Sequence, residues 1–448
     1  MKKNLGFTLI ELMIAMVIGL ILMLGIATIF SNTTNNIRLQ RGIANIQDAG
    51  RISYDFLKND IADAGALYGS SINIQVAQNG QMPQRSVTSF FVTPGLTYQG
   101  NDENARTNTL AASSINDSGL FYGLPTASDT VTLAAAAPVA RGPVEILPNA
   151  YRISARYFIQ GHECTTVSTC VPALTSDGAA RNYAGATAAT LVAGAAVGQR
   201  VLGADVLTIR HLVGNGASIA SLTPGATPVY TLQPGALARL GLTAYPSRLT
   251  DRLVMMADTE RAAIYLGNFD AAGTTFTITG APTTDTGALG FSADRNSRIF
   301  DMENQFLTVT YFLQNVADPN VPGRIIAALM RQENGRNLEE IARGVERLDF
   351  RYKVGEFTES SGWLTADEVS NLPVAACPPQ ALDTAEGACG WRDVSVVEVG
   401  FLVNTVDDVP IPDSTVTYTM NQVNGAAATG RTLRREFRFS VPIRAWQQ

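Results

Sequence analysis

The chain begins MKKNLGFTLIELMIAMVIGLILMLGIATIF over residues 1–30, and this stretch decides how the rest is built. Lys2 and Lys3 precede Gly6, and residues 7–30 then form an apolar run whose one charged side chain is Glu11. A helix of this length is roughly 36 Å long, enough to cross a hydrocarbon core of about 30 Å. Because the lysines flank the N-terminal end, the positive-inside rule places that end in the cytoplasm and the remaining chain across the membrane.

A secretory signal peptide is the simplest alternative for this stretch. Such a peptide carries its cleavage site of small residues after the apolar core. Here the one local candidate, Gly6-Phe7, comes before the core. Glu11 also lies inside the apolar run, where a carboxylate is costly and usually has a functional partner. Both features argue against a removable signal and against a simple anchor.

The segment Gly6-Phe7-Thr8-Leu9-Ile10-Glu11 resembles the leader of type IV prepilins and type II secretion pseudopilins. The resemblance implies a leader of residues 1–6, which prepilin peptidase removes after Gly6 before it methylates the new N-terminus at Phe7. It also implies that Glu11 forms a charge pair with the N-terminal ammonium of a neighbouring subunit. Opposite charges attract strongly in a low-dielectric helix bundle and are costly when left alone, so the pair would favour one axial register.

Residues 31–68 are predicted to continue the helix as an amphipathic segment that lies on a globular head. Apolar side chains recur there at three- and four-residue steps or their sums, which is the helical period. These side chains are Leu39, Ile43, Ile46, Tyr54, Leu57 and Ile61. Ala64-Gly65 and Gly69 then supply a stop signal.

Residues 69–448 are predicted to form a large β-rich head, so the expected fold class is α+β with a long, pilin-like N-terminal helix. Short runs of β-branched and aromatic residues recur there, separated by Gly, Pro and Asn. The predicted strands span residues 89–93, 129–133, 151–159, 206–209, 274–279, 306–312, 347–354 and 394–403. Residues 215–300 are rich in Thr, Gly and Pro, which marks a candidate insertion in the head.

Four further segments are similar to the PilW family of minor pilins. They are Leu57-Lys-Asn-Asp60, Asp205-Val-Leu-Thr-Ile-Arg210, Leu338-Glu-Glu-Ile-Ala-Arg-Gly-Val-Glu-Arg-Leu348 and Arg434-Arg-Glu-Phe-Arg-Phe439. The resemblance implies a structural subunit that primes pilus assembly, with the filament tip as its candidate position. It implies partnership with other minor pilins, the major pilin and the assembly platform. The subunit would start in the inner membrane with a periplasmic body and end in the pilus at the cell surface.

Two alternatives remain open from the sequence. A minor pseudopilin of the type II secretion system, J-like, has a similar plan. From another class, a membrane-anchored adhesin or surface-binding module would use the large head to contact a surface. Recovery of pilus subunits, secretion subunits or neither with the purified protein distinguishes these functions.

The four cysteines form two local pairs, Cys164 with Cys170 and Cys377 with Cys389. An exported, oxidising setting favours disulfides, although four cysteines allow three connectivities. The local pairing is the one we predict, from proximity in sequence. His162 beside Cys164 invites a zinc site, but neither spacing is a usual zinc-ligand pattern.

Composition argues against two further classes of function. A net charge of −6 does not suit a nucleic-acid binder that works by neutralising phosphates. The chain has two histidines, His162 and His211, and no nucleophile elbow, HExxH motif or P-loop accompanies them. No enzymatic activity, cofactor or metal is therefore expected. Trp363 and Trp391 flank the loop from Cys377 to Cys389, and buried packing is preferred there over a partner-binding surface.

Overall fold

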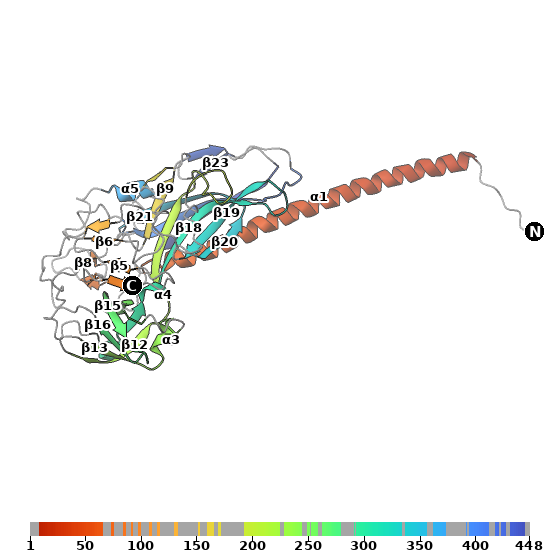
Figure 1. Cartoon of the computed structure of the whole chain (residues 1–448). Coiled ribbons are helices and arrows are strands. Elements are labelled where there is room, and N and C mark those ends of the chain that lie inside the picture. The colour runs from red at the N-terminus through yellow and green to blue at the C-terminus, as the bar shows by residue number, and fades with distance from the viewer. Residues whose placement is uncertain are drawn as a thin grey trace, which may run out of the picture.

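A computed structural model of the chain places a long helix beside a β-rich head (Figure 1). It describes the helix and the turn that follows it up to residue 65, several short strands between residues 73 and 152, and most of the chain from residue 159 to 443. The longer described ranges are 9–65, 159–164, 169–171, 192–224, 228–243, 249–250, 252–258, 262–278, 293–333, 337–355, 362–372, 394–411, 417–420, 423–426 and 431–443.

Helix α1, Leu9–Ala62, runs for 54 residues and extends out of the head, so that its first half lies away from the head (Figure 1). Leu, Ile, Met and Ala dominate its first half, and most of these residues favour helix. The helix stops where the sequence predicts a stop. Gly65 adopts a positive φ of 69°, and its N–H donates to the carbonyl of Arg210 at 2.9 Å. The chain therefore turns directly onto the sheet at the helix end.

A buried stripe fastens the second half of α1 to the head. Its members Gly42, Ile46, Gly50, Ser53, Leu57 and Ile61 recur at steps of three or four residues, and Ala62 beside them is also buried. The prediction for Ile46, Leu57 and Ile61 agrees with this stripe, but Ile43 is 37 % exposed. Glycines take the central positions because the head approaches closely. A Cβ on Gly42 would lie 2.9 Å from the side chains of both Thr405 and Val409.

The first sheet of the head has six strands in the order β10-β9-β11-β18-β19-β20, and each neighbouring pair is antiparallel. The strands are Cys170–Val171 (β10), Ile159–Cys164 (β9), Val206–Leu212 (β11), Phe306–Ala317 (β18), Ile325–Glu333 (β19) and Asn337–Arg343 (β20). One face supplies Leu207, Ile209 and Tyr311 to the main core. The opposite face buries a second cluster that includes Val206 and Phe312.

A second sheet of three antiparallel strands, in the order β21-β22-β25, completes the main core. The strands are Val345–Val354 (β21), Val394–Asn404 (β22) and Arg434–Pro442 (β25). The core lies between the two sheets and α1, and it includes Phe401 and residues of the buried helix stripe. Tyr54 of the helix meets the ring of Phe439 edge-on, with 4.6 Å between centroids. Aromatic contacts thus hold the helix against β25.

Six strands form a closed antiparallel barrel in the order β12-β13-β16-β15-β14-β17. They are Ala217–Thr223 (β12), Val229–Leu232 (β13), Thr275–Ile278 (β16), Ala262–Phe269 (β15), Arg252–Ala257 (β14) and Arg298–Asp301 (β17), with short helices Ala236–Arg239 (α3), Ala293–Arg295 (η4) and Met302–Gln305 (α4). The barrel has its own apolar core, which includes Tyr230, Phe276 and Phe291. In sequence it lies between β11 and β18, two strands that pair through Leu212 and Phe306. The chain therefore leaves the sheet and returns to it at neighbouring positions.

The barrel lies beyond the C-terminal end of α1, on the side of the head away from the N-terminus (Figure 1). Other short strands pair as β1-β2, β3-β8, β4-β5, β6-β7 and β23-β24. Their bounds are Asn73–Gln75 (β1), Gln84–Ser86 (β2), Phe91–Val92 (β3), Thr97–Gln99 (β4), Thr107–Thr109 (β5), Ser114–Asn116 (β6), Thr130–Thr132 (β7), Tyr151–Arg152 (β8), Thr417–Met420 (β23) and Val423–Ala426 (β24). Helix α5, Ala366–Ser370, starts with a capping box between Thr365 and Glu368.

Candidate functional site: the assembly helix and its attachment to the head

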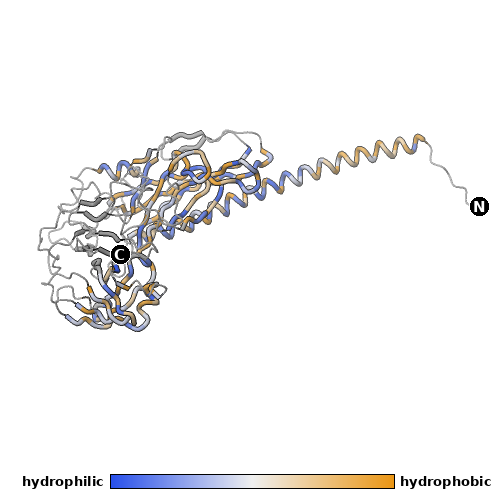
Figure 2. The backbone as a smooth tube through the Cα atoms, in the orientation of Figure 1, coloured by the Kyte–Doolittle hydropathy of each residue, from blue (hydrophilic) through white to orange (hydrophobic). Residues whose placement is uncertain are grey.

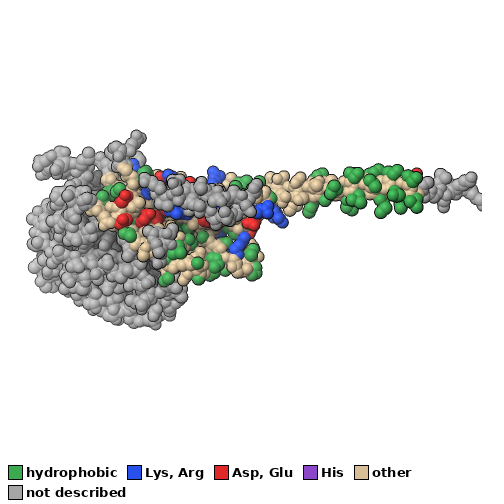
Figure 3. All heavy atoms as spheres, turned by 90° about the horizontal axis from the view of Figure 1, so that it is seen from above, with side chains coloured by type: hydrophobic (Ala, Val, Ile, Leu, Met, Phe, Trp, Pro, Cys, Tyr) green, Lys and Arg blue, Asp and Glu red, His purple; other side chains and the backbone are tan. Residues whose placement is uncertain are grey.

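The first half of α1 is an exposed apolar rod. Leu9, Leu20 and Phe30 are 76 %, 71 % and 73 % exposed. Most residues of this part of the helix are hydrophobic (Figure 2), and their side chains cover its surface (Figure 3). Among the described residues, α1 is the one helix that is long and apolar enough to cross a membrane. A continuous apolar surface of this size needs lipid or protein around it. The helix therefore presents a membrane-spanning or helix-bundling surface.

Glu11 lies in the first turn of α1 and is the acidic residue of that turn. A carboxylate is favourable at a helix N-terminus because the helix dipole is positive there. The same position leaves Glu11 within an otherwise apolar surface, as the sequence indicates. Gly6 and Phe7 lie outside the described residues, so cleavage and methylation there stay predictions, and so does the charge pair of Glu11.

A polar clamp fixes the C-terminal end of α1 to the six-stranded sheet. One carboxylate oxygen of Asp60 accepts hydrogen bonds from the Tyr311 hydroxyl at 2.6 Å and from Nε of Arg331 at 2.7 Å. Arg331 also pairs with Glu333, and its guanidinium lies 5.9 Å from the centroid of the Phe56 ring. The clamp joins α1 to β18 and β19, so the direction of the helix is set by the sheet.

Burial tunes the protonation of the clamp. It raises the pKa of the Tyr311 hydroxyl, and the nearby Asp60 charge raises it further, so the hydroxyl stays protonated and donates. Burial alone would lower the pKa of Arg331, but its hydrogen bond and charge pairing with Asp60 outweigh that effect and raise it. Burial lowers the pKa of His211 on β11, against the opposing charge of Asp60. Tyr311 and Arg331 therefore both stay protonated and remain hydrogen-bond donors to Asp60.

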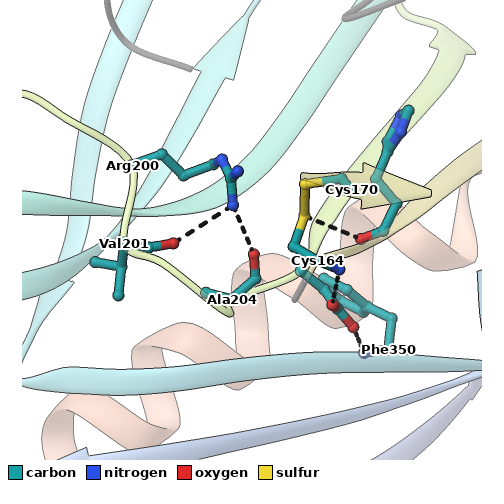
Figure 4. Close-up of a disulfide and its surroundings, with 8 residues drawn as sticks. Cys164, Cys170, Arg200, Val201, Ala204 and Phe350 are labelled. Atoms are coloured by element: carbon teal, nitrogen blue, oxygen red, sulfur yellow. Dashed lines mark hydrogen bonds between the residues drawn. A yellow bond between two sulfur atoms is a disulfide. The ribbon is translucent and has the colours of Figure 1, made fainter. Parts of the chain in front are cut away.

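Asp205, directly before β11, ties the two sheets together. Its Oδ1 accepts the N–H of Cys164 and its Oδ2 accepts the N–H of Phe350, both at 3.0 Å, and its own N–H donates to Leu348 at 2.9 Å. Arg200 donates to the Ala204 carbonyl at 3.0 Å and so closes the loop that leads to Asp205 (Figure 4). A fully buried carboxylate is costly unless it is hydrogen-bonded, and these two backbone donors meet that need.

Three acidic side chains cluster at this joint. Burial raises the pKa of Glu163 to about 7, and the charge of Asp349 adds to the effect. Burial also raises the pKa of Asp205, as does the charge of Glu163, against the two backbone hydrogen bonds. For Asp349, burial raises the pKa while the hydrogen bond from Arg347 lowers it. The cluster therefore binds protons more readily in the folded protein than in the unfolded chain.

A disulfide joins Cys164 to Cys170, with 4.0 Å between their Cα atoms (Figure 4). The two residues face each other in the β9–β10 pair. The disulfide therefore links the edge strand β10 to β9, beside Asp205. Cys377 and Cys389 lie outside the described residues, and their pairing stays a prediction.

The remaining candidate residues of the sequence fall inside the head. His162 is fully buried on β9, and in the part of the chain that the structure describes no cluster of His, Cys, Asp and Glu could hold a metal ion. Trp391 is buried against Tyr352, with 4.9 Å between ring centroids, and its indole N–H donates to Ser370. Trp363 lies under the Lys353 ammonium, 5.1 Å from the ring centroid. Both tryptophans therefore pack against residues of the head.

Comparison with known proteins fits this geometry. Residues 1–27 match the prokaryotic N-terminal methylation motif, over the stretch that leads into the exposed half of α1. The class defined by this motif, the apolar helix and the β-rich head is that of the type IV pilins. Residues 310–445 match the type IV pilus-assembly protein W family, from β18 to the last strand. The C-terminal part of the chain is thus similar to the PilW family, and its N-terminus carries the pilin methylation motif.

The comparison with solved structures adds little. It finds a type IV-like pilin from Thermus thermophilus that is 14 % identical over 44 % of this chain and 87 % of that chain. Its TM-score of 0.15 is too low for the likeness to inform the arrangement of the head. No curated protein matches the chain.

Proposed function

We propose that this pilin is a minor subunit that primes assembly of a type IV pilus. The observation that carries the proposal is the exposed apolar half of α1, with Glu11 in its first turn, attached to a head that matches the pilus-assembly family. A single subunit leaves this surface uncovered once the helix leaves lipid. A bundle of pilin helices covers it, so the filament core is the natural destination of α1.

The proposed entry into the filament uses the residues at the N-terminus. Prepilin peptidase removes residues 1–6 and methylates the amine of Phe7. The carboxylate of Glu11 then pairs with the N-terminal ammonium of a neighbouring pilin. Inside a helix bundle the attraction between these charges is strong, and leaving either of them alone is costly. The pair therefore selects one axial register for the incoming subunit.

The proposed setting before assembly is the inner membrane. Lys2 and Lys3 hold the N-terminus on the cytoplasmic side, and the head lies in the periplasm. The disulfide between Cys164 and Cys170 suits an oxidising compartment. Other minor pilins, the major pilin and the assembly platform are the proposed partners.

The position of the barrel supports a place at the filament tip. The barrel extends the head beyond the C-terminal end of α1, which is the direction away from the membrane half (Figure 1). A shaft subunit has other subunits above its head, and the added bulk would have to fit between them. A tip subunit has none above it, so the barrel can project freely.

The experiment that tests this function compares wild type with Glu11→Gln, which keeps size and removes the charge. Both proteins are purified in detergent from cells, and copurifying proteins are identified by mass spectrometry. We expect both to be inserted and processed, but only wild type to recover other pilins; Glu11→Asp keeps the charge at shorter reach and serves as control. Equal recovery with Glu11→Gln would refute the charge pair. Recovery of type II secretion subunits in place of pilins would refute the pilus assignment.

A further inference from the structure

Residues 31–36 interrupt the strong helix formers of α1 with the sequence Ser-Asn-Thr-Thr-Asn-Asn. We call these six residues the collar. Each is a weaker helix former than Ala, by about two- to threefold in helix population, so six in succession weaken the local helix on the order of a hundredfold. Figure 3 shows this segment as a band of uncharged polar surface between the apolar rod and the arginines near the head.

No packing described in the structure offsets this weakness. The collar residues are exposed or half-buried, and the first buried residue of α1 is Gly42. Further along, the pair of Arg51 with Asp55 supports the helix surface across one turn. The collar contains no charged side chain that could form such a pair.

Two threonines, one just before the collar and one within it, direct their hydroxyls back to the helix. Thr28 Oγ1 donates to the Gly25 carbonyl and Thr34 Oγ1 donates to the Phe30 carbonyl, both at 2.8 Å. Such bonds compete with the helical hydrogen bonds of those carbonyls and tend to bend a helix. The two acceptors, Gly25 and Phe30, lie in the last two turns of the apolar rod, next to the collar, where a bend would turn one half of α1 against the other.

We propose that the collar is a hinge, at which α1 opens and lets the head change its angle to the membrane-spanning half. The two halves are supported from different sides, one by its apolar surroundings and the other by the head. The collar between them depends on its intrinsic propensity alone, so it is the part of α1 that opens first. Six residues at 1.5 Å each make the collar about 9 Å long. The apolar rod before it is long enough to span the hydrocarbon core, so the collar would lie where the helix passes the lipid headgroups.

The hinge has a consequence that rests on the proposed function. A pilin in the bilayer must reach the angle that its neighbours in the filament impose on its head. An opened collar lets the head adjust while the membrane half, with Glu11, is already docked. A stiff helix would have to satisfy both contacts at once, so fewer encounters would be productive.

The first test is amide hydrogen exchange of the full-length protein in lipid nanodiscs, followed by mass spectrometry. Opening the collar frees N–H groups from residue 32 to residue 40, because each bonds to a carbonyl four residues earlier. We expect these amides to exchange at least about tenfold faster than those of residues 46–58, which are docked on the head. Equal protection in the two segments would overturn the hinge.

A matched pair of variants links the exchange to helix propensity. The collar variant combines Asn32→Ala, Thr33→Ala, Asn35→Ala and Asn36→Ala. The control makes four comparable changes at exposed positions of the docked segment, namely Gln40→Ala, Asn45→Ala, Gln47→Ala and Asn59→Ala. We expect collar exchange to slow at least about tenfold in the first variant and to stay unchanged in the second. A collar variant that exchanges like wild type would overturn the proposed cause.

The same variants test the role in docking. We expect the collar variant to insert and to be processed normally but to recover severalfold fewer partner pilins than the control. Wild-type recovery by the collar variant would overturn this role. If wild type and both variants all fail to recover pilins, the proposed function fails, while the exchange data still decide whether the hinge exists.

Discussion

Among the described glycines of α1, Gly50 is the one that the head approaches most closely, and replacing it with Ala tests how the head is attached. A Cβ at this position would lie 2.3 Å from Cζ of Phe437, with two further ring atoms at 2.5 and 2.7 Å. Carbon atoms in contact prefer about 3.5–4.0 Å, so the ring or the helix must move by about 1.2 Å or more. The ring cannot yield easily, because Phe437 stacks on Phe401 with 5.2 Å between centroids.

Two effects of opposite sign set the magnitude. Ala in place of Gly in a helix interior stabilises the helix by about 1 kcal/mol. Overpacking a filled core costs about 1–3 kcal/mol, and the stacked ring places Gly50 toward the upper end of that range. We therefore expect Gly50→Ala to lower the free energy of unfolding of the head by about 1–2 kcal/mol, although helix propensity alone predicts the opposite sign.

The assay is urea unfolding of the detergent-solubilised protein, followed by tryptophan fluorescence. Gly25→Ala is the matched control, because no heavy atom lies within 4 Å of the position of its Cβ. We expect the control to unfold like wild type or at slightly higher urea, because Ala favours the helix, and Gly50→Ala to unfold at lower urea. A Gly50→Ala protein as stable as the control or more so would show that the helix is not docked as closely as the structure has it.

Three further predictions concern other parts of the chain. Gly6→Glu should block processing, so that uncut precursor accumulates in immunoblots, whereas mature protein starting at Phe7 in this variant would contradict the prepilin leader. Glu163 has a pKa of about 7 in the folded protein and an ordinary value of 4.5, so its contribution to stability is fully present below pH 4.5 and is lost as the pH rises through 7. Glu163→Gln should therefore flatten the fall in unfolding free energy between about pH 5 and 8. An unchanged slope would mean that other groups cause this fall. Asp60→Ala and Tyr311→Phe should each destabilise the head by about 1–3 kcal/mol, and a double-mutant cycle should show coupling through the 2.6 Å hydrogen bond, whereas additive effects would argue against the clamp.

The long helix and its end could be predicted from sequence because the signals are local. A continuous apolar run needs no knowledge of its neighbours, and Gly65 ends the helix through its own backbone conformation. Strands such as β11, β18 and β22 were also predictable, since β-branched and aromatic residues dominate them. The α+β class follows from these elements alone.

The attachment of the helix could not be predicted, because it depends on side chains distant in sequence. Helical periodicity predicts buried positions from apolar side chains, so it does not identify Gly42 and Gly50. These two glycines are buried because their lack of a side chain lets the head pack closely against the helix. From the sequence, Asp60 is a polar residue on the helix surface. Only the structure shows that Tyr311 and Arg331 lie beside it and donate hydrogen bonds to it. β19 was missed as well, since Ile325 to Met330 is an unbroken apolar run without alternation.

The barrel lies between β11 and β18 in sequence, and these two strands stay paired where the chain leaves the sheet and returns to it. The chain leaves β11 at Leu212 and enters β18 at Phe306, and these two residues are directly paired, so the ladder between the strands extends up to the barrel. Asp301 fixes the path of the chain from the barrel to β18. Its side chain caps α4, and its Oδ1 accepts a hydrogen bond from Nε of Arg252 in the barrel at 3.0 Å. The barrel is thus tied to β18, which the clamp ties to α1. Any tilt of the head at the collar would therefore carry the barrel with it.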